Sequence, residues 1–347
     1  MGGFIDLQVN GYAGVDFQSP DLSLDKIHLV SRTLFEKGTC GYLATVVTAS
    51  RETYQRALPV LAQAVREGDS RRRLLGVHLE GPFISDQDGA VGAHPKSCVA
   101  PCDPAFLDEL IDWSEGTVKV LTVAPERPGA LDLIRHACER GIVVSLGHSL
   151  ANCEQYAAAV EAGAKLATHV GNGIPQQIAR QDTPITACLG NHDLTAMIIT
   201  DGHHLIDPFI KMVLYAKGTE HTIVTSDSAP VAGLKPGDYT CFGSPARLEP
   251  NGYLRNLAAP GLAGSSCCLL ECLNYLAALL KEDFAIPPLV DIHENRFFNQ
   301  SLVEFLWRIG FHNAADLIGI NPDSDVDDPG FFFDDERFST GVGWIRR

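Results

Sequence analysis

The sequence predicts an α/β fold, and within that class a (β/α)8 barrel of the TIM type. Short apolar runs typical of buried parallel strands alternate with segments of helical period along most of the 347 residues. The strand-like runs cover residues 3–9, 41–48, 74–80, 118–124, 142–147, 165–169, 195–200 and 222–227. Because these runs are apolar on both faces, they fit the hidden strands of a barrel. A doubly wound open sheet is the alternative, and the eight strand–helix units and the polar residues at the strand ends favour closure.

The segments between the runs have apolar residues at helical spacing. Leu24, Ile27 and Val30, for example, line one face of a predicted helix. No repeat or Ser/Gly-rich linker divides the chain. We therefore expect one barrel domain over residues 1–310. An irregular acidic and aromatic segment, residues 311–347, is expected to pack on the barrel or at an interface.

Composition and charge narrow the classes of function. The formal net charge of −16 argues against nucleic acids and anionic membranes as main partners. No apolar run reaches the roughly 18 residues of a membrane span, and the N-terminus lacks the basic and apolar regions of a signal peptide. The 10 cysteines are scattered without a CxxC pair. We expect a cytoplasmic protein with reduced thiols.

Polar residues stand where several predicted strands end. Glu80 ends the third run, His148 follows the fifth, His169 ends the sixth and Asp227 ends the eighth. The carboxyl ends of barrel strands form one rim, so these side chains should meet there. One carboxylate and two imidazoles are the ligand set of a catalytic metal with positions open for water. Taken singly, each residue also fits a structural role, as a turn cap or a hydrogen-bonded histidine.

A series of motifs then resembles a known family. "GFIDLQVNG", "GVHLEGPF", "GAH", "GHS", "THVGNGIP", "DGHH", "SDSAPVAG" and "LAGSS" occur in the order found in N-acetylglucosamine-6-phosphate deacetylases of the amidohydrolase superfamily. The resemblance runs from residue 3 to about residue 275 and implies a barrel of the amidohydrolase kind. The family's small flanking β domain is expected to be largely absent, because the first barrel strand begins at residue 3.

The resemblance also implies a cofactor. Most amidohydrolases carry His-x-His at the end of the first strand, where this chain has Gln8-Val9-Asn10. That difference implies one divalent metal ion per subunit, held by Glu80, His148 and His169. Zinc is the expected metal, with iron or another divalent ion as alternatives.

Catalytic and substrate-binding residues are implied by the same motifs. Asp227 matches the catalytic acid/base, and His94 matches the histidine near the acetamide carbonyl. Arg180 matches an arginine that contacts the phosphate, often from the neighbouring subunit, so a homodimer is expected. The full set of substrate-binding residues is Ala93, Asn172, Gly173, Arg180, His203, His204, Leu262, Ala263 and Gly264.

The implied function is hydrolysis of N-acetylglucosamine 6-phosphate to glucosamine 6-phosphate and acetate, with a metal-activated water as nucleophile. Two departures leave the sugar open: no lysine directly precedes "GAH", and "QD" follows Arg180 where "EPG" is frequent. An alternative is therefore a deacetylase for another N-acetyl sugar, such as N-acetylgalactosamine 6-phosphate, or another N-acyl amide hydrolase. A sugar-phosphate-binding regulator is the non-enzymatic alternative, and the retained ligands and acid/base argue against it.

Overall fold

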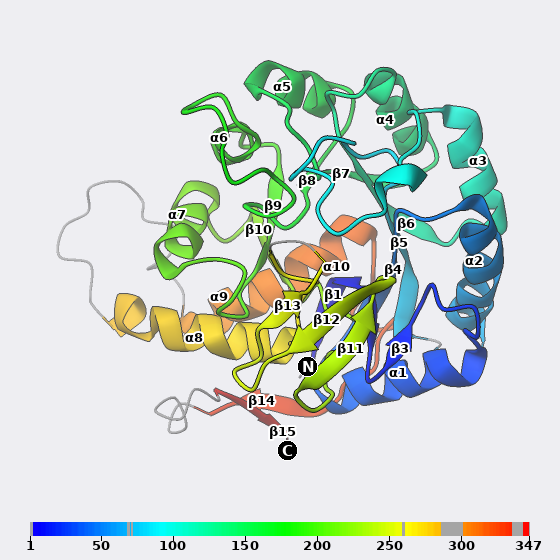
Figure 1. Ribbon diagram of the computed structural model, residues 1–347. Coiled ribbons are helices and arrows are strands. Elements are labelled where there is room, and N and C mark those ends of the chain that lie inside the picture. The colour runs from blue at the N-terminus through cyan, green and yellow to red at the C-terminus, as the bar shows by residue number, and fades with distance from the viewer. Residues whose placement is uncertain are drawn as a thin grey trace.

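The computed structural model describes residues 3–67, 70, 72–258, 261–285, 301–334 and 343–346. Its central feature is an eight-stranded parallel sheet ringed by helices (Figure 1). In sheet order the strands are β1 (Phe4–Val9), β4 (Thr39–Val47), β5 (Leu74–Glu80), β6 (Val118–Val123), β7 (Val143–Leu146), β8 (Leu166–Ala167), β9 (Thr195–Ile199) and β10 (Thr222–Thr225). Each lies within or overlaps one predicted run. The sheet is a nearly closed barrel, so the predicted TIM-type fold is confirmed.

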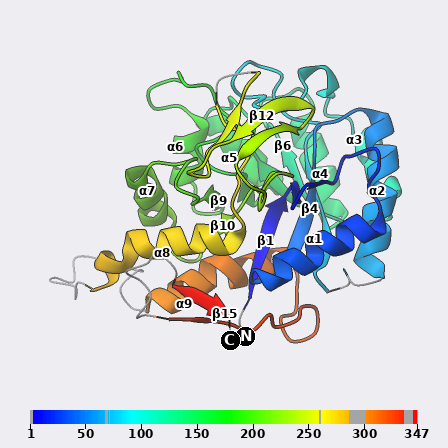
Figure 2. The ribbon, with the colours of Figure 1, turned by 60° about the horizontal axis from the view of Figure 1, so that its bottom comes forward.

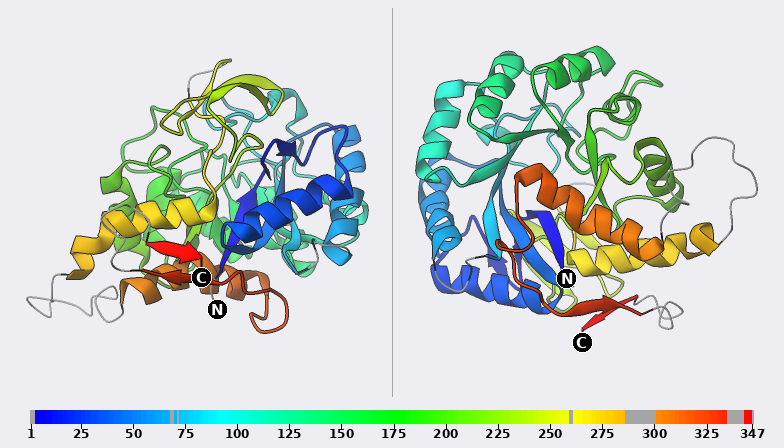
Figure 3. Two further views of the ribbon diagram at one scale, coloured as in Figure 1. Left: turned by 90° about the horizontal axis from the view of Figure 1, so that it is seen from below. Right: turned by 180° about the vertical axis from the view of Figure 1, so that it is seen from behind.

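Most of the helices cover the outside of the barrel, and the last of them lies across its lower end, as the view from behind shows (Figure 3, right). They are α1 (Leu24–Glu36), α2 (Arg51–Arg66), α3 (Pro104–Trp113), α4 (Ala130–Glu139), α5 (Cys153–Glu161), α6 (Pro184–Gly190), α7 (Asp207–Lys217), α8 (Leu269–Ala285), α9 (Leu302–Trp307) and α10 (Asn313–Ile318). The described residues also include a 3-10 turn (Lys96–Cys98) and a π-helical turn (Arg308–His312). Local capping starts several of them; at α5 the side chains of Asn152 and Gln155 form a capping box.

The barrel closes where β1 meets β10. The backbone N–H of Asn10 donates to the carbonyl of Ser228 over 2.9 Å. Oδ1 of Asp6 accepts hydrogen bonds from Thr225 Oγ1 at 2.7 Å and from the Ser226 N–H at 3.1 Å. Burial raises the pKa of Asp6, although these hydrogen bonds oppose the rise. A buried carboxyl thus joins two strands that share few backbone hydrogen bonds.

The barrel interior has an apolar lower layer and a polar upper layer. In the lower layer, side chains of the barrel strands pack against side chains that follow α9. The strands β1, β4, β6, β8, β9 and β10 contribute Ile5, Leu7, Leu43, Val120, Leu166, Met197 and Ile223. The segment after α9 contributes Phe311, Ala314 and Ile318. Fully burying a large apolar side chain contributes about 1.5–3 kcal/mol to stability. This plug fixes the strands from below and leaves the upper rim free for chemistry.

Three smaller sheets occur among the described residues, and two of them lie at opposite ends of the barrel (Figure 2; Figure 3, left). The antiparallel sheet of β11 (Gly237–Cys241), β12 (Ser244–Leu248) and β13 (Leu254–Asn256) lies over the upper rim. The pair β14 (Phe331–Phe333) and β15 (Trp344–Arg346) lies near the N-terminus, and a short pair, β2 (Gly11–Tyr12) and β3 (Val15–Asp16), follows β1.

The segment after the barrel contributes to the lower end of the molecule. The Trp344 ring packs edge-on against Phe4 and Trp307, with ring centroids 5.0 and 5.2 Å apart. The proposed division into a barrel (1–310) and a C-terminal segment (311–347) stays a prediction.

Among the described residues, no helix has the length and apolar character needed to cross a membrane.

Candidate metal centre and active site

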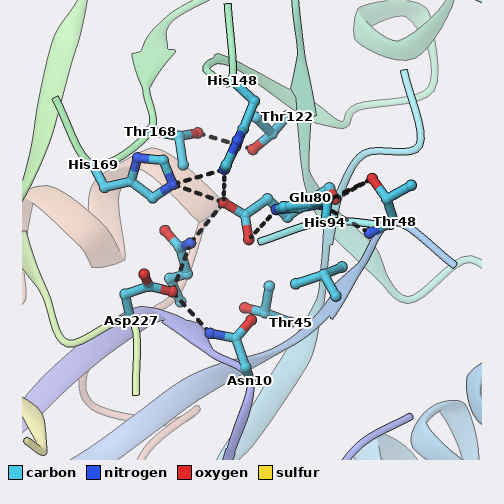
Figure 4. A network of polar contacts seen from close by, with 12 residues as sticks. Asn10, Thr45, Thr48, Glu80, His94, Thr122, His148, Thr168, His169 and Asp227 are labelled. Carbon is cyan, nitrogen blue, oxygen red and sulfur yellow. Dashed lines mark hydrogen bonds and ion pairs between the residues drawn. The ribbon is translucent and has the colours of Figure 1, made fainter. Parts of the chain in front are cut away.

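Glu80, His148 and His169 meet at the upper mouth of the barrel (Figure 4). Oε1 of Glu80 lies 3.1 Å from His148 Nε2 and 2.8 Å from His169 Nε2. The two Nε2 atoms are 3.1 Å apart. All three side chains are buried, and their candidate ligand atoms lie within 4.8 Å of one another. No other group of this kind occurs in the part of the chain that the structure describes.

Hydrogen bonding prepares this group for a cation. Nδ1 of His148 lies 2.8 Å from the carbonyl oxygen of Ala90, so the ring donates there and presents the Nε2 lone pair to Glu80. Burial opposes the charge of Glu80, yet its close contacts with the imidazoles of His148 and His169 hold its pKa well below the ordinary range. Nitrogen lone pairs and a carboxylate oxygen converge here, and such acceptors repel unless a cation or shared proton lies between them. The three residues therefore fit a divalent metal ion.

The backbone turns the site residues inward by an unusual conformation. His148, His169 and Asp227 each stand two residues after the end of a strand. Their φ angles are 49°, 27° and 49°, in the left-handed region, which costs about 1–3 kcal/mol per residue. Gly92 and Gly173 leave room for the imidazole of His148, since a Cβ on either would lie 3.0 Å from ring atoms. Surrounding packing must hold these turns in place.

Asp227 lies beside the candidate ligands, on the other side of Glu80 from His94. Its Oδ1 accepts hydrogen bonds from Gln8 Nε2 at 3.0 Å and from Asn10 Nδ2 at 2.8 Å. Burial, together with the negative charge of Glu80, raises the pKa of Asp227 to about 6. A carboxyl with a pKa near neutrality can both accept and return a proton.

His94 is held as a neutral hydrogen-bond donor. Its Nδ1 lies 3.2 Å from the backbone N–H of Thr48 and 3.0 Å from Thr48 Oγ1, so Nδ1 is the acceptor and Nε2 carries the proton. Burial, reinforced by the nearby His148, lowers the pKa of His94 to about 3. Nε2 points toward Glu80, 3.7 Å from its Oε2. The ring therefore directs an N–H into the site at neutral pH.

His78, also on β5, has a structural role below the site. Its Nδ1 lies 3.0 Å from the carbonyl of Leu7 and its Nε2 lies 2.8 Å from Thr122 Oγ1. Burial lowers its pKa to about 4, so the ring is neutral. Thr122 Oγ1 is in turn 2.9 Å from Thr168 Oγ1, next to His169 in the chain. This polar layer supports the candidate ligands from beneath.

The site opens into a cavity of about 650 Å³. The cavity lining includes all four rim residues predicted from the sequence. Of the other predicted site residues it includes Ala93, His94, Asn172, Gly173, His203, His204, Leu262 and Gly264. Arg180 and Ala263 are not in the lining: Arg180 is exposed and Ala263 is buried. No lysine or arginine among the described residues lines the cavity.

Comparison with known proteins places the chain in a family. No protein-family model matches it. The N-acetylgalactosamine-6-phosphate deacetylase of Escherichia coli O157:H7 is 35% identical over 265 residues, which are 76% of this chain and 68% of that protein. The N-acetylglucosamine-6-phosphate deacetylase of Bos taurus is 32% identical over 285 residues, 79% of this chain and 68% of that protein.

The chain belongs to the N-acetylglucosamine-6-phosphate deacetylase family. The family predicted from the motifs, and with it the class of enzyme, is confirmed. The chain spans about two thirds of the length of these relatives; in the Bacillus subtilis (strain 168) enzyme, 32% identical, the match covers 66% of that protein.

Solved structures of this deacetylase family have the same barrel. The N-acetylglucosamine-6-phosphate deacetylase of Mycobacterium smegmatis, a mutant in complex with N-acetyl-D-glucosamine-6-phosphate, matches with a TM-score of 0.80 at 26% identity. The match covers 92% of this chain and 77% of that one. The Thermotoga maritima deacetylase matches with a TM-score of 0.76 at 27% identity, over 92% and 78% of the two chains.

Several residues at the site were not found by sequence reasoning. Asp201 holds His204: its Oδ2 accepts from His204 Nδ1 at 2.8 Å and from Ser265 Oγ at 3.0 Å. The sequence signal was present, because Asp201 stands two residues after β9. Phe242 and Tyr253 line the cavity from the loops of the small rim sheet, and no periodic pattern marks them.

Proposed function

We propose that this chain is a metal-dependent deacetylase acting on a 2-acetamido-hexose 6-phosphate. It hydrolyses the acetamide and releases acetate and the amino sugar 6-phosphate. N-acetylglucosamine 6-phosphate is the first candidate, and N-acetylgalactosamine 6-phosphate is the second because the E. coli relative carries that name at 35% identity. The observation that carries the proposal is the convergence of Glu80, His148, His169 and Asp227 in one cavity.

The proposed cofactor is one divalent ion held by Glu80, His148 and His169, with zinc as the first choice for one carboxylate and two imidazoles. When bound, such an ion lowers the pKa of a water ligand from about 15.7 towards 7 and polarises an acyl oxygen. All three side chains are buried, and each also lines the cavity through which a water ligand would reach the ion.

The protein's own groups move the proton. Asp227 takes a proton from the attacking water and gives it to the sugar nitrogen, which otherwise leaves poorly as an amide anion. Burial raises the pKa of Asp227 toward neutrality, which favours both transfers. The Nε2–H of His94 donates to the acetyl oxygen as negative charge develops there, and the neutral ring needs no deprotonation to do so.

Phosphate recognition is proposed to need a second subunit. The cavity lining among the described residues has no lysine or arginine, although a phosphate dianion calls for one. Asn172 and the backbone N–H of Gly173 offer neutral donors in the lining. Arg180 is exposed between β8 and α6, so it is available to enter the cavity of a second copy in a homodimer.

All 10 cysteines are unpaired, which supports a cytoplasmic location.

Acetate release tests the proposal. The metal-loaded protein should hydrolyse N-acetylglucosamine 6-phosphate faster than unphosphorylated N-acetylglucosamine, and N-acetylgalactosamine 6-phosphate serves as the competing substrate. Equal turnover with and without phosphate would contradict phosphate recognition. Metal binding without turnover of any of these amides would favour the regulator.

The role of Arg180 across subunits has its own test. Arg180→Ala should raise KM for the phosphorylated substrate, whereas Arg135→Ala, which removes an exposed arginine on α4, should not. Mixing Arg180→Ala chains with inactive Asp227→Asn chains should restore part of the activity, because one cavity of the mixed dimer then has both groups. No restoration would place Arg180 in its own chain's site or outside the site.

A further inference from the structure

The side-chain amides of Gln8 and Asn10 both donate to the same oxygen of Asp227. Figure 4 shows the Asn10 amide pointing at that carboxylate. Gln8 Nε2 lies 3.0 Å from Oδ1, and Asn10 Nδ2 lies 2.8 Å from it. Gln8 Nε2 also lies 2.9 Å from Glu80 Oε1, so one amide bridges two carboxylates. Both amides come from the end of β1, across the closing seam from β10.

The orientation of these amides is set by the carboxylates. Gln8 Oε1 and Asn10 Oδ1 are buried and have no hydrogen-bond partner among the residues that the structure describes. Leaving a buried acceptor unpaired is unfavourable, so neither amide is oriented by the needs of its own oxygen. Turning either one over would place its oxygen against the carboxylate of Asp227. The donors are therefore committed to Oδ1.

The two carboxylate oxygens of Asp227 differ in their hydrogen bonds, because both amides donate to Oδ1. Oδ2 accepts no hydrogen bond from the described residues, and the side chain lines the cavity. We propose that Asn10 and Gln8 are positioning residues that hold Oδ1 and leave Oδ2 as the oxygen that takes up and returns the proton. This inference rests on the proposed function of Asp227 as acid/base. Oδ2 gains the proton of the water and loses it to the sugar nitrogen, while Oδ1 keeps its two donors.

A substitution of Asn10 tests the positioning of Asp227 without disturbing a candidate metal ligand. Within the described part of the chain, the Asn10 side-chain amide donates only to Asp227 and, at 3.3 Å, to the carbonyl of Ser228. Gln8, by contrast, also contacts Glu80, so its replacement disturbs a candidate metal ligand. Asn10→Ala removes the donor, and Asn10→Asp keeps the shape but replaces the donor with a negative charge.

The test compares Asn10→Ala, Asn10→Asp and Ser228→Ala as metal-loaded proteins. Ser228→Ala is the matched control, because it removes a buried hydrogen bond of 3.1 Å to Gly11 at the same seam without touching the Asp227 side chain. We expect Asn10→Ala to lower kcat on the order of 10²-fold with unchanged KM and metal content. Asn10→Asp should lower kcat further, and Ser228→Ala should keep wild-type kcat.

Crystal structures provide a readout independent of turnover. In Asn10→Ala the Asp227 carboxylate should rotate or become disordered, while Glu80, His148 and His169 stay in place. Wild-type kcat in Asn10→Ala, or loss of activity in proportion to loss of metal, would overturn the positioning role. If the wild-type protein deacetylates no sugar phosphate, the proposed function fails. The carboxylate position in Asn10→Ala still decides whether the amides hold Asp227; an unmoved carboxylate would refute it.

Discussion

The carbonyl oxygen of Ala90 accepts a hydrogen bond from His148 Nδ1 over 2.8 Å, and this bond turns the Nε2 lone pair toward Glu80. Ala90 belongs to the loop between β5 and α3, which also carries His94. One loop therefore both orients a candidate metal ligand and carries the proposed donor to the substrate oxygen. Movement of this loop would disturb both functions together.

Removing the charge of Glu80 should weaken the binding of the metal ion. Glu80→Gln keeps the shape of the side chain but offers a neutral oxygen to a divalent ion. We expect the variant to lose metal during dialysis, measured by inductively coupled plasma mass spectrometry. Glu109→Gln, an exposed substitution on α3, is the control and should keep it. Full metal content in Glu80→Gln would rule out this ligand role.

Asp227→Asn should separate metal binding from catalysis. The amide cannot take up a proton from water, so kcat should fall by about 10²- to 10⁴-fold. Metal content should stay at the wild-type value, because Asp227 is not one of the three clustered ligand residues. Acetate release and metal analysis on the same preparation check both expectations. Near-normal turnover would mean that another residue moves the proton.

His94→Ala should lower kcat by about 10²- to 10³-fold through loss of the donor to the acetyl oxygen. Because the pKa of His94 is about 3, the ring stays neutral throughout the neutral and alkaline range. The ratio of wild-type to variant kcat should then be independent of pH in that range. A ratio that changes with a titration near neutrality would show that His94 acts as an acid or base instead.

Asp6 should make the stability of the seam depend on pH. Burial raises its pKa in the folded protein above the unfolded value of about 3.9. Its contribution to the free energy of unfolding is thus fully present below the unfolded pKa and is lost as pH rises through the folded pKa. Relative to Asp6→Asn, the wild-type protein should lose stability from acidic to neutral pH. Urea unfolding of the two metal-free proteins at several pH values measures this difference; a constant or rising difference would contradict it.

Sequence reasoning found those features that depend on local pattern. The eight strands follow from apolar runs, and Glu80, His148, His169 and Asp227 follow from polar residues at the ends of those runs. The roles of Gln8 and Asn10 could not be found in this way. In the sequence, Gln8 and Asn10 stand out only because they lie where most amidohydrolases have histidines. In the structure, their amides donate across the β1–β10 seam to Asp227.

Other parts of the site depend on contacts that no local pattern encodes. Tyr253 and Phe242 reach the cavity because the β11–β13 sheet folds back over the rim. Thr48 sets the tautomer of His94 through its backbone N–H, a group that every non-proline residue has. Arg180 lies outside the cavity lining, and the role proposed for it requires a second chain.

Anomalous diffraction from crystals of the active protein, measured at the absorption edge of the bound metal, tests the central claim most directly. The account predicts a single peak about 2.0–2.2 Å from Glu80 Oε1 and from the Nε2 atoms of His148 and His169. A peak bound by other residues, or no peak in crystals whose dissolved protein still releases acetate, would contradict it.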